Sequence, residues 1–188
     1  TGLFSEFEGT ILYVSHDIDE AYRFCDRIAV VDGGHIDEIG PKDKVVHHPS
    51  SLAAVKLSGC KNTTPAVRVG PHEAFLPEWG ISLATAEQVA PDVKWLGVRA
   101  FSLRRAAHPG ANVFRVRADR VSDSRFERTA LLGFLDRDET FAPTVKRTDD
   151  EMKYLHQHLF WRVDKLAVPA DELPHEGEEL WIRIPPNK

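Results

Sequence analysis

The stretch Thr10–Pro41, with the sequence TILYVSHDIDEAYRFCDRIAVVDGGHIDEIGP, decides the fold of the first part of the chain. Its first six residues, TILYVS, form a nearly unbroken apolar run, which predicts a strand buried on both faces. Ile28–Asp32 predicts a second apolar strand, and Gly33-Gly34 permits a tight turn into a third strand over His35–Ile39. Such short strands separated by short helices indicate an α/β unit.

A helix is expected between the first two strands. Asp17 is a good N-cap residue, and Glu20 stands three positions later, where it would close a capping box. Apolar residues then recur at the spacing of one helical face, namely Ile18, Ala21, Tyr22 and Cys25. Two more short helices are expected over Pro41–His47 and Leu52–Leu57, the second preceded by two serines as candidate caps.

The chain changes character near residue 60, and strand patterns dominate beyond it. Short strand segments are expected around Val67, Phe75 and Ile81. Longer strands are expected at Val93–Phe101, Asn112–Val121, Glu127–Leu135, Leu159–Leu166 and Glu179–Ile184. The polar segment Asp136–His158 predicts a loop with a helical turn or two around Asp150–Leu155. Many short strands with turns between them indicate a small barrel or sandwich.

Composition restricts the class of protein. A hydrophobic content of 42% and a formal net charge of −5 over 188 residues fit a globular protein and argue against nucleic acid as the main partner. No apolar run is long enough to span a bilayer, so no direct membrane insertion is expected. Two cysteines suit a reducing compartment. The chain starts without methionine and soon enters a strand pattern, so we expect a fragment of a longer protein, and its cysteine usage fits the cytoplasm.

His16 is the first candidate for chemistry, because it stands where an apolar strand ends and a helix begins. Ligands of open α/β sheets collect at such strand ends, and a histidine there can hydrogen-bond a phosphate. The alternative from position alone is a polar residue at a strand exit without a role.

The residues around His16 resemble the segment of ABC-transporter ATPases that carries the switch histidine. The family pattern is a strand, S/T-H-D, an acidic helix, D-R-I with a strand, a G-x-I hairpin and a G-P or G-T turn. It appears here as Ser15-His16-Asp17, Glu20-Ala21, Asp26-Arg27-Ile28, Gly34-His35-Ile36 and Gly40-Pro41. The resemblance implies that His16 contacts the γ-phosphate of ATP, bound with Mg²⁺ in the full-length subunit, and helps to position the attacking water.

Parts of an ATPase are missing from this sequence. No Gly-Lys pair occurs in it, so it contains no G-x-x-x-x-G-K-[ST] phosphate loop. Leu57–Lys61 (LSGCK) resembles the LSGGQ signature but lies downstream of His16, and Gly33 follows Ile28–Asp32 where a Walker B strand would have a glutamate. We therefore expect no bound cofactor and no ATP hydrolysis by this chain alone, whereas the parent subunit would be an ATPase.

The second part resembles the accessory domain of molybdate-type ATPase subunits. The features that carry this resemblance are Leu57–Asn62, Trp79–Leu83, Ala86-Glu87 and Gly97–Ala100. It implies a small oligonucleotide-binding-like (OB-like) barrel that regulates the transporter and in some members binds an oxyanion. The expected fold is thus an α/β remnant of an ABC ATPase domain over residues 1–58, followed by an all-β regulatory domain over residues 59–188.

Basic residues near the junction could hold an oxyanion. The candidates are Lys61 and Arg99, with Ser58, Arg104 and Arg105 as further donors, because the planar guanidinium fork suits tetrahedral oxyanions. The alternative is that these are solvated surface charges. No metal site is expected: His47-His48 lie at a helix end, and His156 and His158, even on one strand face, fall short of the three or four ligands of zinc.

Three functions from different classes follow. The first is a regulatory C-terminal fragment of the ATP-binding subunit of an importer for molybdate or a related oxyanion, peripheral to the membrane and working with permease subunits. The second is a stand-alone oxyanion- or small-ligand-binding β-module, and the third, disfavoured by the acidic balance, is a nucleic-acid-binding barrel. Apolar faces of residues 1–57 that lack cover lead us to expect a homodimer.

Overall fold

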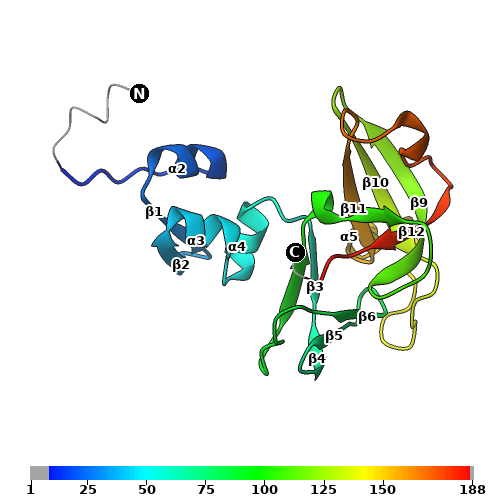
Figure 1. The fold of residues 1–188 in the computed structure, drawn as a ribbon. Helices are drawn as coiled ribbons and strands as arrows, with labels where there is room; N and C mark the ends of the chain where they lie inside the picture. The colour runs from blue at the N-terminus through cyan, green and yellow to red at the C-terminus, as the bar shows by residue number, and fades with distance from the viewer. Residues whose placement is uncertain (1–8, 187–188) are drawn as a thin grey trace. The chain divides into compact units, whose positions relative to one another are not determined.

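The chain forms two compact units, one ending at Gly59 and the other starting at Cys60. The structure is a computed structural model that describes residues 9–186 (Figure 1). Each unit has its own hydrophobic core. No helix in the described range is long and apolar enough to cross a bilayer.

The first unit is an antiparallel hairpin covered on one face by short helices. Its elements are α2 (Ile18–Phe24), β1 (Arg27–Asp32), β2 (His35–Pro41), α3 (Lys42–His47) and α4 (Leu52–Leu57). Gly33 and Gly34 have φ values of 53° and 81°, a left-handed turn that glycine adopts without strain. The core contains Ile28 and Val30 of β1 with Val45 and Ala54 of the helices. The predicted hairpin and the three helices are confirmed.

The predicted strand over Thr10–Ser15 is wrong. None of the sheets in residues 9–186 includes these residues. Leu12 is 91% exposed and Val14 is 87% exposed, so these side chains face solvent instead of packing against neighbouring residues as in a buried strand. A strand needs a partner for its backbone N–H and C=O groups, and β1 and β2 pair with each other instead.

The N-cap of α2 is confirmed, but the capping box is wrong. The Asp17 carboxylate accepts hydrogen bonds from the backbone N–H groups of Asp19 and Glu20, at 2.8 and 3.2 Å. The second bond of a capping box, from the Asp17 N–H to the Glu20 carboxylate, is not formed because the Asp17 N–H donates to the Ser15 hydroxyl. The Glu20 carboxylate turns to accept from the hydroxyls of Tyr13 and Ser15.

The second unit is mostly β. Its strands are β3 (Asn62–Pro65), β4 (Val67–Gly70), β5 (Glu73–Leu76), β6 (Ile81–Ala84), β7 (Trp95–Val98), β8 (Arg104–Ala106), β9 (Val113–Asp123), β10 (Glu127–Phe134), β11 (His158–Asp164) and β12 (Glu179–Arg183). Five of them form a curled sheet in the order β11-β10-β9-β12-β8 (Figure 1). Two small sheets, β3-β7 and β4-β5-β6, complete the unit. The inner faces share one core that includes Trp79, Leu132 and Ile182.

Three expectations for this unit change in the structure. The strand expected over Val93–Phe101 is limited to β7, because a 3-10 helix (η1) begins at Ala100. β3 and β8 were not expected from the sequence. The expected helical segment is confirmed as α5 (Glu151–His156), so His156 ends a helix and His158 begins β11, and the two do not share a strand face. A second 3-10 helix, η2, covers Ala170–Glu172.

Two asparagine side chains join the small sheets to the large one. The Asn62 amide donates to the Phe160 carbonyl at 2.8 Å and accepts from the Phe160 N–H at 2.7 Å. Asn112, at φ 54°, makes the same pair of bonds with the backbone of Ala84, both at 2.8 Å. Each amide thus acts as one more peptide group at a strand edge and satisfies groups that would otherwise lack a partner.

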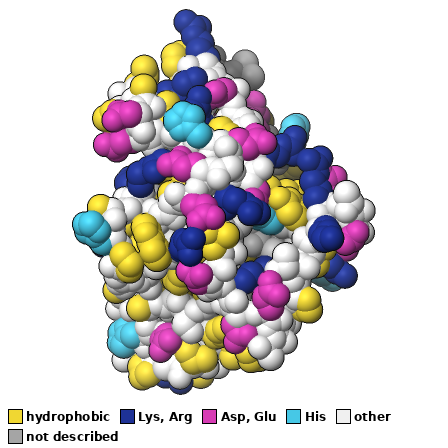
Figure 2. Space-filling view, turned by 90° about the vertical axis from the view of Figure 1, so that its right-hand side faces the viewer, with side chains coloured by type: hydrophobic (Ala, Val, Ile, Leu, Met, Phe, Trp, Pro, Cys, Tyr) yellow, Lys and Arg dark blue, Asp and Glu magenta, His cyan; other side chains and the backbone are white. Residues whose placement is uncertain are grey.

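The outer surface of the second unit carries many ion pairs. Lys and Arg side chains alternate with Asp and Glu over the face in Figure 2. Among them, Arg115 pairs with Glu179 at 2.6 Å and Arg128 with Asp123 at 2.8 Å. The guanidinium of Arg128, with Lys165, lowers the pKa of Asp123 to about 2. Exposed pairs of this kind add little to stability, but each neutralises its own arginine locally.

Candidate functional site

His16 lies in solvent immediately before α2. Its residue is exposed, and within residues 9–186 its imidazole forms no hydrogen bond or ion pair. The ring of this exposed residue therefore stands close to the start of a helix. An imidazole in this setting can donate a hydrogen bond to an anionic ligand or accept one from water.

The segment that carries His16 is held by polar side chains on both sides. Ser15 accepts from the Asp17 N–H and donates to Glu20, at 3.0 Å in each case. The Tyr13 hydroxyl donates to the same Glu20 oxygen at 2.9 Å, and the loss of this bond on ionisation raises the pKa of Tyr13. These contacts fix the backbone on either side of His16, although residues 9–15 ahead of it form no strand.

The two sequence motifs that resemble nucleotide-binding elements lie in other environments. Ile28–Asp32 belongs to the antiparallel hairpin and runs directly into the Gly33-Gly34 turn. Leu57 ends α4, and Gly59 follows it with φ 81°. Neither segment forms a glycine-rich loop ahead of a helix, the arrangement that binds phosphate.

Lys61 and Arg99 come together at one end of the β3–β7 ladder. Asn62 pairs with Val98, so Lys61 and Arg99 are the flanking residues at the same end. The Lys61 ammonium lies 5.9 Å from the centroid of the Phe160 ring. Burial raises the pKa of the neighbouring Cys60 thiol, against the opposing effect of the Arg99 charge. The sequence did not predict this proximity, since 38 positions separate Lys61 from Arg99 (99 − 61).

The further donors considered from the sequence are engaged elsewhere. Arg105 makes a bidentate ion pair with Glu178, at 2.7 and 3.1 Å. Arg104 donates to the backbone carbonyls of Phe101 and Leu103, and the Ser58 hydroxyl donates to the Val55 carbonyl. Of the basic candidates, Lys61 and Arg99 are the two that the fold brings to one place.

A polar cluster on the outer face of the large sheet was missed by the sequence analysis. Asp119 accepts from His158 Nε2 at 3.0 Å and from Arg117 Nε at 2.6 Å. His158 is buried, and its Nδ1 lies against the backbone carbonyl of Tyr154. The ring centroids of His158 and Tyr154 are 4.0 Å apart. The signal available in the sequence was a histidine beside the alternating apolar residues of β11.

A register shift in the β9–β10 ladder makes room for this cluster. Arg120 pairs with Leu131 and Ala118 with Leu132, so Asp119 is the extra residue. Burial disfavours the ionised form of Asp119, but the hydrogen bonds from His158 and Arg117 outweigh it and lower the pKa of Asp119. Gly133 leaves the space, because a Cβ there would lie 2.4 Å from Asp119 Oδ2. This cluster fixes α5 against the sheet.

Glu38 is the buried carboxylate of the first unit. Its Oε2 accepts from the backbone N–H groups of Ser50 and Ser51, at 2.9 and 3.0 Å, ahead of α4. Burial works against ionisation, yet these bonds outweigh it and the pKa of Glu38 lies below its usual value. The carboxylate thus ties β2 to the loop that begins α4.

The described residues hold no group of three or more His, Cys, Asp and Glu side chains arranged for a metal ion. His47, one of the histidines considered from the sequence, lies 3.4 Å from the Tyr22 hydroxyl, which donates to Asp43 at 2.6 Å. These contacts join α2 to α3.

The chain is similar to ATP-binding subunits of import systems, although no family model matches it. It is 26% identical over 196 aligned positions to the maltose/maltodextrin import ATP-binding protein MalK of Photorhabdus laumondii, across 99% of the chain and 46% of that protein. It is 30% identical to the Fe(3+) ions import ATP-binding protein FbpC 2 of Rhizobium meliloti, across 73% of the chain and 36% of the relative. A third relative, the sulfate/thiosulfate import ATP-binding protein CysA of Brucella melitensis, is 36% identical across 39% of the chain and 20% of its own length.

The chain therefore spans less than half the length of each of these relatives. The relatives are ATP-binding subunits of ABC importers, and the match to MalK extends through both units.

Proposed function

We propose that the chain is the C-terminal part of an ABC importer ATP-binding subunit: residues 1–58 belong to the ATPase domain, and residues 59–188 form its regulatory domain. The single observation that carries the proposal is the exposed, unpartnered imidazole of His16 within residues 9–186, on a segment fixed by Ser15 and Glu20. Its setting suits contact with a γ-phosphate. The similarity to import ATPases along nearly the whole chain supports the same assignment.

In the complete subunit, two ATPase domains would close around two ATP molecules with Mg²⁺. His16 would hydrogen-bond the γ-phosphate and orient the attacking water, which is positioning and electrostatic stabilisation rather than covalent catalysis. Closure would move permease subunits in the membrane. The β-rich domain, which we relate to OB-like accessory domains, would restrain or pair the two copies on the cytoplasmic side.

The test is His16→Ala in the full-length subunit. Turnover of ATP should fall about 100-fold or more, while nucleotide binding stays within about twofold, because His16 acts on the transferred group. His35→Ala is the matched control, since His35 is another exposed histidine of the first unit, at the hairpin turn. Unchanged turnover in His16→Ala, or equal losses in both variants, would remove His16 from the mechanism.

For the second unit we propose oxyanion binding at Lys61 and Arg99, with molybdate or a related tetrahedral anion as ligand. Support comes from the meeting of these two cations at one end of the β3–β7 ladder. Calorimetric titration of the 188-residue chain with molybdate, tungstate and sulfate is the direct measurement. Saturable binding that Arg99→Gln abolishes agrees with the proposal, and the absence of a binding signal with all three anions refutes it. Tight binding by a chain that has no effect on transport would favour a stand-alone binding module.

A further inference from the structure

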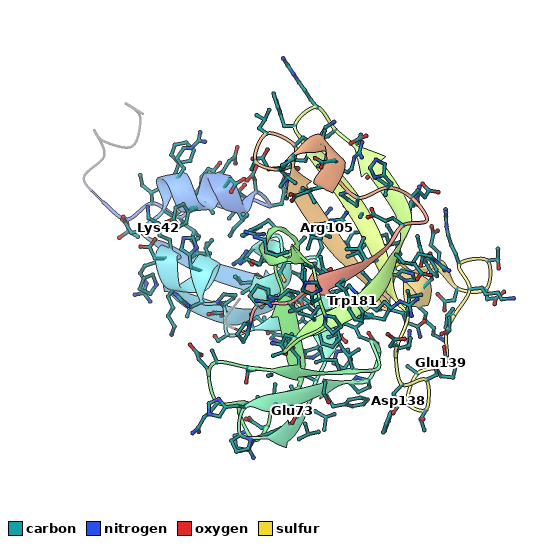
Figure 3. All side chains as sticks on the ribbon, turned by 45° about the vertical axis from the view of Figure 1, so that its right-hand side comes forward. Lys42, Glu73, Arg105, Asp138, Glu139 and Trp181 are labelled. Atoms are coloured by element: carbon teal, nitrogen blue, oxygen red, sulfur yellow. The ribbon has the colours of Figure 1, made fainter. Side chains whose placement is uncertain are left out.

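The outer face of β12 and β8 carries two arginines beside a tryptophan, and no ion pair within residues 9–186 balances the charge of either arginine. In β12, Leu180 and Ile182 are buried in the core, whereas Trp181 and Arg183 lie on the opposite face. Arg183 pairs in register with Arg104 of β8, and Trp181 pairs with Ala106. Figure 3 labels Trp181 on this strand. We call Arg104, Trp181 and Arg183 the arginine platform.

The two arginines of the platform repel each other in the chain as it stands. Like charges directly opposite on neighbouring strands are destabilising. Both side chains are exposed, and no carboxylate of residues 9–186 forms an ion pair with either. Arg104 donates only to backbone carbonyls, which leave its charge uncompensated.

The neighbouring arginines show what is unusual about this pair. Arg115, which faces Trp181 from β9, is bound to Glu179 at 2.6 Å. Arg117 is bound to Asp119 at 2.6 Å. The two arginines at this edge of the sheet thus lack the carboxylate partners that Arg115 and Arg117 have, in a chain whose net charge is −5.

The same edge offers backbone groups. β8 is the outer strand of the five-stranded sheet in the described residues, so one side of its backbone faces away from β12. An extended peptide can add to such an edge through main-chain hydrogen bonds, and its alternate side chains then lie on the face of Arg104 and Ala106. The small side chain of Ala106 leaves the half-buried Trp181 ring open to an apolar neighbour.

We propose that the arginine platform is a docking site for an acidic protein segment, in which carboxylates alternate with apolar residues. Carboxylates bind the guanidinium forks of Arg104 and Arg183 and remove their repulsion. An apolar residue of the segment covers Trp181, and tryptophan and arginine are the side chains that carry most of the energy of protein interfaces. A nucleic-acid strand fits less well, because it needs a row of cations and the next arginines are already neutralised.

The experiment uses the 188-residue chain and a fluorescein-labelled peptide of alternating glutamate and leucine, followed by fluorescence anisotropy. Saturable binding that weakens with added salt is expected, and a peptide of alternating lysine and leucine should not bind. Arg183→Glu and Arg104→Glu should each weaken binding about tenfold or more, and Trp181→Ala about fivefold. The matched control is Arg68→Glu, on the outer strand β4 of another sheet, which should bind like the unaltered chain.

Far-UV circular dichroism and thermal melting identify any variant that fails to fold, and Arg183→Gln then replaces the charge reversal with a milder change. The proposal is overturned by the absence of saturable binding to the glutamate peptide at low salt. It is equally overturned if Arg68→Glu weakens binding as much as Arg183→Glu. A thymidine oligonucleotide that displaces the peptide at lower concentration than unlabelled peptide would assign the surface to nucleic acid instead.

Discussion

Replacing Asn62 with alanine should separate β3 from the edge of β11. Asn62 is 1% exposed, and its amide makes two hydrogen bonds to the backbone of Phe160. The alanine variant leaves the part-buried N–H and C=O of Phe160 without partners, and an unsatisfied buried group of this kind costs about 1–3 kcal/mol. The expected loss is therefore about 2–6 kcal/mol, a large part of the about 5–15 kcal/mol that holds a typical domain folded.

Asn112 supplies the comparison, because it makes the same two bonds to Ala84 and both of these bonds are exposed to solvent. Water can replace the amide there, so Asn112→Gly should lose only about 0.5–1.5 kcal/mol. Glycine is chosen because residue 112 has φ 54°, which alanine would adopt only with strain. The two variants thus remove equal numbers of hydrogen bonds and differ mainly in burial.

Urea denaturation followed by tryptophan fluorescence measures both variants in the 188-residue chain. Asn62→Asp adds a pH-dependent test. Its ionised carboxylate repels the Phe160 carbonyl, whereas the protonated acid can donate a hydrogen bond to it. The loss in free energy of unfolding relative to the unaltered chain should therefore shrink as pH falls. Equal losses from Asn62→Ala and Asn112→Gly would refute the reasoning. A loss below about 1 kcal/mol in Asn62→Ala would do so as well.

Three further results are expected. Gly133→Ala should lower stability by about 1–3 kcal/mol, since the added Cβ would lie 2.4 Å from Asp119 Oδ2, and an unchanged melting temperature would contradict this. Because the pKa of Asp119 is lowered on folding, its stabilising effect is complete above the unfolded pKa of about 4 and is lost as pH falls through the folded pKa. Urea midpoints of the unaltered chain should therefore fall more steeply below about pH 5 than those of Asp119→Asn, and parallel curves would argue against it. The chain alone should release no phosphate from ATP, and release that His16→Ala abolishes would show that the missing phosphate loop is not required.

The elements of the first unit followed from neighbouring residues. Asp17 caps α2 because its carboxylate reaches N–H groups two and three positions ahead. Ser51 caps α4 through the Ala54 N–H in the same way. The Gly33-Gly34 turn follows from the left-handed conformations that glycine adopts. The failed capping box was equally local, but the Ser15 hydroxyl competed successfully for the Asp17 N–H.

The candidate site was only partly open to prediction. His16 could be selected from its own surroundings in the sequence, and its exposure agrees with a residue that meets a ligand. The Asp119–His158 pair could not be found this way, because it depends on a register shift between β9 and β10 and on the space at Gly133. The position of Arg104 directly opposite Arg183 likewise appears only when the strands are paired.

The sequence by itself determined the helix caps, the hairpin turn, the change to β structure near residue 60 and the resemblance around His16. Each of these depends on residues within a few positions of one another, whose interactions form in any fold that leaves them intact. Tertiary structure alone decided that Thr10–Ser15 stays unpaired, that Asn62 binds Phe160 from 98 positions away, and that Lys61 meets Arg99. These outcomes depend on which strand edges come together, and pairing between distant strands is set by the packing of the whole core rather than by local preference.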